Sequence, residues 1–315
     1  MFRTLARVLL AKIESTYGTD SVPVVGTDAL DASNVKVREV PDILERDVVR
    51  GDLSPIAPVV GQKKMEITFS TELKGSGALG TAPAIGDLFQ ACGYAETVSA
   101  GSSVVYLPTS SAMKGVTIYV YDNQDTGNTL LRKLVGCRGT FRLQAEAGKF
   151  AKIEWTFTGF YTAPSDVSAP SAATYESTIP AVVESAAFTL NSNTSLVVQQ
   201  LTIEQNNQVE DRDDISGTNS GLKEIIITGR KPGGTFNPEQ VLVATYDFYA
   251  DWAASTARAL SVIVGTVAGN KITITAPKVT IDSFDDDNRN GILTKNVPFR
   301  MSRNSGNDEL RFSFA

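Results

Sequence analysis

Residues 139–157 read GTFRLQAEAGKFAKIEWTF, and this stretch decides the fold class. On each side of Gly148, polar and apolar side chains alternate strictly, along residues 140–146 and again along residues 152–157. Because successive side chains of a strand point to opposite faces, the alternation predicts two half-buried antiparallel strands. Gly148 lies where a hairpin turn is needed to join them.

Strand-like alternation also dominates most of the remaining chain and recurs, for example, at residues 64–70 and 116–121. One helix interrupts it. Apolar side chains recur at helical spacing from Ile85 to Cys92, and a glycine then ends the helix. We therefore predict a mainly β, antiparallel protein with a short flanking helix.

The second half of the chain repeats the order of elements in the first. A strand pattern at residues 260–264 answers the one at 117–121, and Gly291 answers Gly148, each with an offset of 143 residues (260 − 117 and 291 − 148). A near-constant offset over this distance predicts the duplication of one domain of about 140 residues.

Two further segments extend this repeat. Residues 222–227 answer the strand at 64–69, and residues 242–252 carry apolar side chains at helical spacing. They predict a second helix that corresponds to the one at 85–92.

The predicted domain boundary falls in residues 162–181, which are rich in Pro, Ser, Ala and Thr, as linkers are. The charge balance changes there as well. Through Pro164 the chain has 17 basic and 17 acidic residues, and from Ser165 onward it has 12 and 18. We expect an N-terminal domain with an N-terminal arm at 1–162, a linker at 163–181 and a second, duplicated domain at 182–315.

The chain has no histidine, which excludes Ser-His-Asp and Cys-His nucleophile systems, HExxH zinc sites and histidine pH switches. Its two cysteines, Cys92 and Cys137, cannot supply a zinc knuckle or a disulfide framework and are predicted to be small buried side chains. No apolar run approaches the ~18 residues of a membrane span, and the N-terminus lacks the apolar region of a signal peptide. We expect no cofactor, no metal, no membrane insertion and no Sec export.

The net charge of −6 has the wrong sign for a protein that grips nucleic acid by its phosphates. It suits a surface along which DNA must slide without sticking.

The most acidic stretch, DSFDDDNRNG at residues 282–291, fits the first half of a calcium loop. Such a loop needs a bidentate Glu at its twelfth position, which is Val297 when the count starts at Asp286. Arg289 also places a cation among the would-be ligands. We interpret the stretch as a hairpin turn in which the Asn-Gly dipeptide supplies the positive-φ residues.

Two other motifs could each be interpreted as a functional site. Residues 75–80, GSGALG, match a dinucleotide-binding loop, but no helix begins at the last glycine, so we predict a flexible strand-to-helix loop. Glu146 and Glu154 would serve a carboxylate hydrolase if they met in a cleft about 5–9 Å apart. In the predicted hairpin around Gly148 they would instead be exposed near the same face.

Several longer segments are suggestive together. They are LAKIESTYGTD at 10–20, ERD at 45–47, LKGSG at 73–77, LFQACGY at 88–94, EAG at 146–148, WTFTG at 155–159, GIL at 291–293 and PFR at 298–300. These segments are spread over most of residues 1–162 and, in the second half, lie within 291–300. With them the sequence resembles phage tail tube proteins of the long non-contractile (siphophage) type.

The resemblance implies a fold and a function. The fold would be two tandem tube-like domains, each an antiparallel β-sandwich or flattened barrel with a flanking α-helix. The function would be that of a non-enzymatic virion protein whose rings stack into a hollow tail tube, a negatively lined channel for DNA delivery. Six domains per ring is the usual family arrangement. A duplicated chain would need three copies, a homotrimer ring with pseudo-sixfold symmetry, and six chains is the alternative.

The implied partners are further copies of the chain and other tail proteins, such as the tape measure, tail terminator and distal tail proteins. DNA would pass through without specific binding. The implied location is the virion tail, with assembly in the host bacterial cytoplasm. The acidic candidates for the lumen or its rim are Glu146, Glu154, Glu204, Asp285, Asp286 and Asp287.

Other functions stay open at this point. A two-domain β-sandwich could be a binding module for a carbohydrate or a surface partner. The chain could also be a secretion-system tube protein, or a histidine-free carboxylate hydrolase.

Overall fold

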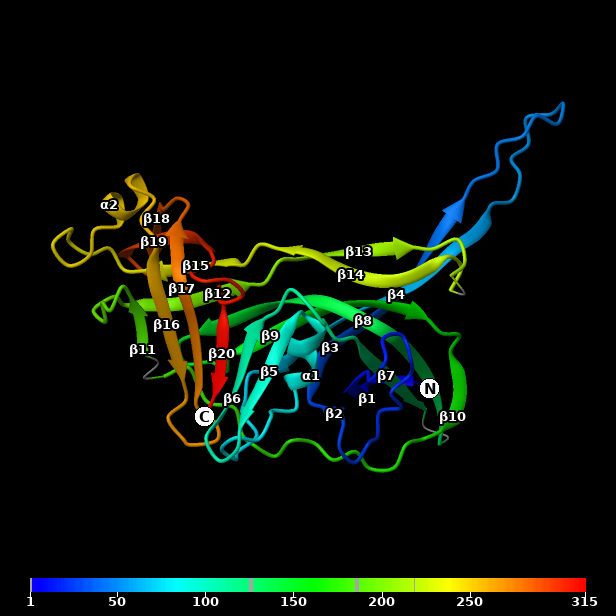
Figure 1. The fold of residues 1–315 in the computed structure, drawn as a ribbon, viewed down its shortest axis with the longest axis horizontal. Helices are drawn as coiled ribbons and strands as arrows, with labels where there is room; N and C mark the ends of the chain where they lie inside the picture. Colours follow the sequence, from blue (N-terminus) through cyan, green and yellow to red (C-terminus); the bar gives the residue numbers. More distant parts are fainter. Residues whose placement is uncertain (1, 125–126, 185–186, 218) are drawn as a thin grey trace.

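The computed structural model describes the whole chain except residues 1, 125–126, 185–186 and 218 (Figure 1). The described residues form long strands and two helices of six residues each. Each pairing between these strands is antiparallel. The prediction of a mainly β, antiparallel protein is confirmed.

The elements, in chain order, are β1 (Phe2–Ile13), β2 (Ala29–Leu30), β3 (Ala32–Leu44), β4 (Val59–Glu72), α1 (Gly86–Ala91), β5 (Tyr94–Ser99), β6 (Ser103–Pro108), β7 (Val116–Gln124), β8 (Asn128–Glu146), β9 (Lys152–Tyr161), β10 (Ser165–Ser168), β11 (Ala187–Leu190), β12 (Val198–Glu204), β13 (Asn207–Asp213), β14 (Leu222–Arg230), β15 (Gly233–Pro238), α2 (Phe248–Ala253), β16 (Arg258–Val264), β17 (Ile272–Ile281), β18 (Asp285–Arg289), β19 (Ile292–Met301) and β20 (Arg311–Phe314).

In the first half of the chain, six strands pair in the order β3-β4-β9-β8-β7-β1. β8 and β9 form the hairpin predicted around Gly148, and Phe141 lies opposite Trp155 within it. The short strand β10 pairs with the start of β8. It lies on the same side as β9, because β7 occupies the other edge of β8 there.

In the second half, six strands pair in the order β12-β15-β19-β17-β16-β11, and β18 continues β17 along the edge of β19. The last strand, β20, pairs with the start of β17. This order matches that of the first half strand by strand, with β20 in the place of β10. Each helix also precedes the corresponding strand, α1 before β7 and α2 before β16.

The two halves share one hydrogen-bonded network. β12 pairs with the end of β8, where Leu201 lies opposite Ala145 and Ile203 opposite Leu143. The C-terminal strand β20 returns to the first half and pairs with β6, where Phe312 lies opposite Tyr106. The main core therefore contains residues from both halves.

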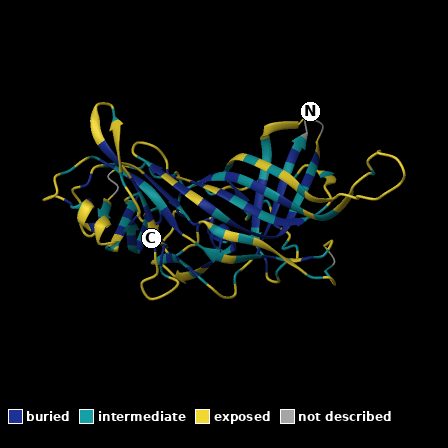
Figure 2. Cartoon of the chain, turned by 90° about the horizontal axis from the view of Figure 1, so that it is seen from above, coloured by how far each residue is buried: buried dark blue, intermediate teal, exposed yellow. Residues whose placement is uncertain are grey.

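Aromatic rings form the centre of this core around Phe89 of α1. Its ring centroid lies 4.7 Å from that of Phe312, 5.1 Å from that of Trp155 and 5.4 Å from that of Phe141. All four side chains are buried. Figure 2 shows burial concentrated along the strands, with exposed residues on the projecting hairpins.

The spacing of apolar side chains predicts the position of α1 better than that of α2. α1 lies within the predicted 85–92 segment and ends before Gly93, whose φ is +83°. α2 is shorter than predicted, because residues 242–246 form a turn and Asp247 starts the helix by accepting a hydrogen bond from the Ala250 backbone N–H at 2.9 Å. No helix in the described part of the chain is long and apolar enough to span a bilayer.

The glycine-rich loop at 75–80 packs against the second half. The Gly77 N–H donates to the Gly269 carbonyl at 3.1 Å, and the Gly75 N–H donates to Asn270 Oδ1 at 2.8 Å. A Cβ on Gly269 would lie 2.4 Å from the Gly77 carbonyl carbon, and a Cβ on Gly75 would lie 2.1 Å from the Gly269 carbonyl oxygen, so Gly269 and Gly75 permit the close backbone contact. The loop joins a strand to a helix, as predicted, and holds the two halves together.

One correspondence drawn from the sequence is wrong. Residues 222–227 lie in β14, which pairs with β13 alone among the described strands. The strand that corresponds to β4 is β15. β4 pairs with β9, and β15 pairs with β19, the strand that corresponds to β9. Alternation alone could not separate the two strands, since each has the same period.

We predict that Phe312→Ala lowers the free energy of unfolding by about 3–5 kcal/mol, because it empties a ring-sized space between the halves. Chemical denaturation of the unassembled chain measures this. Phe150→Ala is the matched control, because that ring is 42% exposed, and it should cost much less. Equal losses in the two variants would show that the shared core is not a main source of stability.

Candidate channel face and open sheet edges

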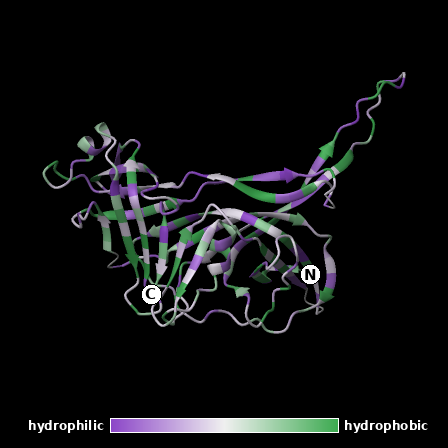
Figure 3. Cartoon of the chain, viewed as in Figure 1, coloured by the Kyte–Doolittle hydropathy of each residue, from purple (hydrophilic) through white to green (hydrophobic). Residues whose placement is uncertain are grey.

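Polar side chains form one face of the joined sheet. Along strands such as β8 and β9 they alternate with the buried side chains of the other face (Figure 3). Arg142 of β8 lies opposite Glu154 of β9 on one side and opposite Glu204 of β12 on the other. Its Nε lies 3.2 Å from Glu204 Oε1. The structure therefore brings the predicted candidates Glu154 and Glu204 together around a cation that was not among those candidates.

Glu146 lies on the same face at the end of β8, four residues beyond Arg142. Its carboxylate accepts a hydrogen bond from Lys149 Nζ at 2.9 Å. Glu154 is exposed. The two carboxylates of the hydrolase alternative thus occupy a polar sheet face, with Glu146 already engaged by a lysine.

Asp285, Asp286 and Asp287 lie apart from these three glutamates, on the β18–β19 hairpin. This hairpin and the β3–β4 arm project at opposite ends of the molecule (Figure 1). Asn290 and Gly291 form its turn with φ values of +54° and +87°, as the predicted Asn-Gly turn requires. Asp285 and Asp287 fall on one face of β18 and Asp286 on the other.

Asp286 holds a buried cation. Lys295 has a side chain that is 3% exposed, and its Nζ donates to Asp286 Oδ1 at 3.0 Å and to Tyr249 Oη at 3.3 Å. The ammonium also lies 4.8 Å from the centroid of the Phe284 ring. Burial alone would lower the pKa of Lys295, but the bonds to Asp286 and Tyr249 outweigh it and raise the pKa above 10.5.

Other parts of the acidic stretch are engaged as well. Arg289 forms an ion pair with Glu239, and the Gly291 N–H donates to Asn288 Oδ1 at 2.8 Å. Within the described residues, no group of three or more acidic or cysteine side chains is arranged to hold a metal ion. Cys92 and Cys137 are free and buried, as predicted, and burial raises the pKa of each thiol.

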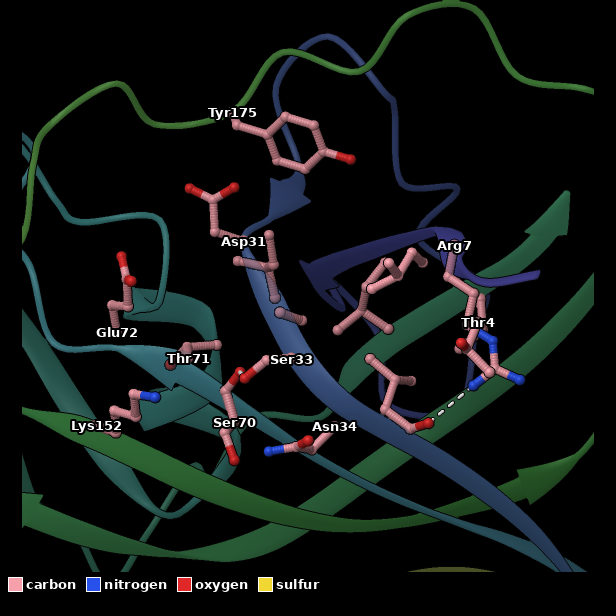
Figure 4. A pocket seen from close by; sticks show the side chains of 16 residues that line it. Thr4, Arg7, Asp31, Ser33, Asn34, Ser70, Thr71, Glu72, Lys152 and Tyr175 are labelled. Atoms are coloured by element: carbon pink, nitrogen blue, oxygen red, sulfur yellow. Dashed lines mark hydrogen bonds between the residues drawn. The ribbon is translucent and has the colours of Figure 1, made fainter.

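A groove of about 680 Å³ runs beside β3 in the first half (Figure 4). Its lining includes backbone and side chains from Ala32 to Val35, together with Leu9 and Val120. Arg7 reaches across it, and its Nη1 donates to the Val35 carbonyl at 2.8 Å. The groove therefore follows a strand edge whose carbonyl is bonded to a side chain rather than to a neighbouring strand.

The open sheet edges of the described chain include one at each half, β3 and β18. β3 pairs with β4 alone, and β18 pairs with β19 alone. Open edges present rows of unpaired N–H and C=O groups, and stable proteins cover or pair them. The backbone groups along the open edges of β3 and β18 could therefore pair with further strands.

Comparison with known proteins decides the family. The family model described as phage tail tube protein matches residues 4–301. The chain belongs to the phage tail tube protein family. The match spans both halves, so the resemblance carried mainly by residues 1–162 extends through the repeat. No curated protein matches the chain.

Sequence reasoning missed how this tail tube protein uses its long hairpins. β13 and β14 form an arm that crosses the first half, where Arg138 Nη1 donates to Glu224 Oε1 and to the Ile225 carbonyl, each at 2.8 Å. The Tyr17 hydroxyl also accepts from the Ile225 N–H at 2.7 Å. The sequence gives no signal for these contacts, because the partners lie more than 80 residues apart in the chain.

We predict that Asp286→Asn lowers the free energy of unfolding of the unassembled chain by about 1–2 kcal/mol, since it leaves buried Lys295 without its carboxylate. Because the pKa of Lys295 is raised in the folded chain, this contribution is present below pH 10.5 and is lost as the pH rises through the folded value. Thermal unfolding at several pH values measures it.

Asp287→Asn is the matched control for this prediction. Asp287 accepts a local hydrogen bond from the Asn288 N–H at 2.8 Å, and an asparagine can keep that bond. This variant should stay within about 0.5 kcal/mol of the parent. If both variants lose the same stability, Asp286 does not hold Lys295.

Proposed function

We propose that the chain is a structural, non-enzymatic protein that assembles into rings of three, and that these rings stack into a hollow tail tube through which DNA passes. The observation that carries the proposal is the matching strand order of the two halves, β3-β4-β9-β8-β7-β1 and β12-β15-β19-β17-β16-β11. It supports two tube units per chain, joined by residues 163–181.

The number three follows from counting units rather than chains. The resemblance implies six units in a ring, and a chain with two units supplies them in three copies. The joined sheet supports this arrangement, because β12 of the second half already pairs with β8 of the first. The internal junction is therefore one of six similar junctions, and three others would lie between chains.

The polar face around Arg142 is the proposed channel lining. α1 and the aromatic core cover the opposite face of the sheet, so the polar face is the one left for solvent. Two of its cations are paired with acids, Arg142 with Glu204 and Arg300 with Asp282 at 2.8 Å. Paired cations bind phosphates weakly, and the net charge of −6 adds a repulsive field.

The remaining assignments follow from this role. The chain would act in the virion tail of a phage with a long, non-contractile tail, after assembly in the host bacterial cytoplasm. Its partners would be copies of itself in the same ring and in stacked rings, and the tape measure, tail terminator and distal tail proteins at the ends. DNA would slide past Glu146, Glu154 and Glu204 without specific contacts.

Negative-stain microscopy with native mass measurement tests the proposal. We expect tubes or rings in which one ring contains three chains, about 101 kDa (3 × 33.7 kDa). A monodisperse monomer at high concentration would contradict the proposal and favour a two-domain binding module. Rings of six chains would retain the tube but contradict two units per chain.

We further predict that Glu154→Lys with Glu204→Lys slows DNA ejection from virions about tenfold or more, because it turns a weakly acidic face into a phosphate-binding one. The matched pair Glu154→Gln with Glu204→Gln removes the acids without adding cations and should have a smaller effect. Microscopy first verifies that variant tails assemble. Unchanged ejection kinetics in the lysine variant would show that this face does not line the channel.

A further inference from the structure

We propose that β3 of each chain pairs antiparallel with β18 of the next chain, with Arg38 opposite Asp285 and Lys36 opposite Asp287. This pairing rests on the proposed ring and names the two edges that close it. The partner is a second copy of this chain. The template is the junction that the chain already contains, where β12 of the second half pairs with the end of β8 of the first.

β3 and β12 are corresponding strands in the two halves. β3 pairs with β4 and β12 with β15, which correspond in strand order. Val37 packs against the core in the first half, as Ile203 does in the second. The pairing of β3 with β4 shifts register just before Ile43, six residues after Val37. The pairing of β13 with β14 shifts register just before Val209, six residues after Ile203. The core face sets the correspondence of Val37 with Ile203, and these shifts agree with it, whereas the earlier shifts, at Ser33–Lys36 and at Val198–Leu201, are displaced from it by one residue.

The end of β8 and β18 are also corresponding strands. Each forms a hairpin with the next long strand, β9 or β19. Arg142 lies six residues before the turn glycine Gly148, and Asp285 lies six residues before Gly291. The turns therefore place Arg142 and Asp285 at the same point of their hairpins.

With these two correspondences, the register of β12 with β8 inside the chain predicts the register of β3 with β18 between chains. Inside the chain, Glu204 lies opposite Arg142. The residue that corresponds to Glu204 is Arg38, one position beyond Val37, and the residue that corresponds to Arg142 is Asp285. Both β3 and β18 are open edges in the described chain, whereas β12 and the end of β8 are paired.

The charges support this register independently. The internal pair consists of Arg142 on β8 and Glu204 on β12. In the proposed pair the signs are exchanged, with the cation on the β12 counterpart and the acid on the β8 counterpart. Lys36, Arg38, Asp285 and Asp287 make no ion pair within the described residues, and all four are exposed. Directly opposed unlike charges stabilise strand pairs, and like charges destabilise them.

The groove in Figure 4 is where the incoming strand would lie. It follows Ala32 to Val35 of β3, so a strand paired with β3 enters it. The Val35 carbonyl, now bonded to Arg7, has a second lone pair for a backbone N–H. The turn of the β18–β19 hairpin ends in Ile292 and Leu293, which are about half exposed and would meet the apolar lining.

The β3–β4 arm gives a second, separate support. Its counterpart, the β13–β14 arm, covers the neighbouring half of the same chain, where Leu222 and Ile225 pack on Phe160. The β3–β4 arm has only polar support at its base, where Gln62 donates to Asp213 and Lys64 pairs with Asp211. Its outer part projects into solvent (Figure 1), with Ile43 and Val60 about half exposed. Docking over the second half of the next chain would cover these side chains.

The positions of the open edges of β3 and β18 also suit a closed ring. The β18–β19 hairpin and the β3–β4 arm project at opposite ends of the chain (Figure 1). Contacts between two different surfaces join copies head to tail, and such contacts close into a ring when the rotation per copy permits it. Three copies would do so if each external junction repeats the rotation of the internal one.

Cysteine cross-linking tests the register. In the template, the Gln205 N–H donates to the Phe141 carbonyl at 3.1 Å, so the adjacent Glu204–Arg142 pair is of the non-hydrogen-bonded type. Cα atoms of such pairs lie about 4.5 Å apart, within disulfide reach. Tubes of the double variant Arg38→Cys with Asp285→Cys, oxidised with diamide, should give covalent dimers and trimers on non-reducing gels.

Two control variants bracket this result. Arg142→Cys with Glu204→Cys should form a disulfide within one chain, even before assembly, and should not link chains. Arg38→Cys with Asp286→Cys places the thiols on opposite faces of the paired strands and should not cross-link. The native Cys92 and Cys137 are buried and stay unreactive in all variants.

Charge exchange provides a second readout. Arg38→Asp or Asp285→Arg alone should raise the concentration needed for half-maximal assembly by about tenfold, because each places like charges opposite one another at every contact between chains. The double exchange should restore assembly. Circular dichroism of the unassembled variants verifies that each is folded.

The outcomes separate this inference from the proposed function. Tubes that form from the parent chain but show no Arg38→Cys to Asp285→Cys cross-link, or no rescue by the double exchange, would overturn the pairing and leave the tube intact. A parent chain that forms no rings at all would overturn both. Cross-links only in the 38–285 pair, together with rescue, would establish the register.

Discussion

The rest of the structure depends on the pairing of β12 with the end of β8. An open β-sheet edge presents unpaired N–H and C=O groups with which another strand can pair. In this chain the second half closes one edge of the first, and Ile203 opposite Leu143 continues the buried face from one half into the other. Because the halves share a sheet, they also share a core, where Phe89 of α1 meets Phe312 of the last strand.

This junction also explains what the two hairpin arms do. The β13–β14 arm follows directly from β12 and lies over the neighbouring half, fixed by the hydrogen bonds of Arg138 and Tyr17. The β3–β4 arm has the same place in the first half, but in a single chain its outer part packs on no apolar surface. In the proposed tube each unit would be completed by its neighbour, and the acidic hairpin at 285–291 would serve as an edge for a basic strand.

Much of the fold could be predicted from sequence, because period-2 alternation marks half-buried strands such as β8 and β9 directly. The Asn290-Gly291 turn was also predictable, since few other dipeptides adopt two positive φ values. The contacts between halves were not. Strand alternation carries no information about partners, so β14 was matched to β4 in error, and the role of Arg142 between two glutamates required the register of three strands.

The most direct test of this account is a cryo-electron microscopy reconstruction of the assembled tube without imposed sixfold symmetry. We predict rings of three chains in which the sheet continues from β3 of one chain into β18 of the next, with Arg38 beside Asp285. A ring of six chains, or a ring in which β18 remains an open edge, would contradict the claim that the internal junction is the template for assembly.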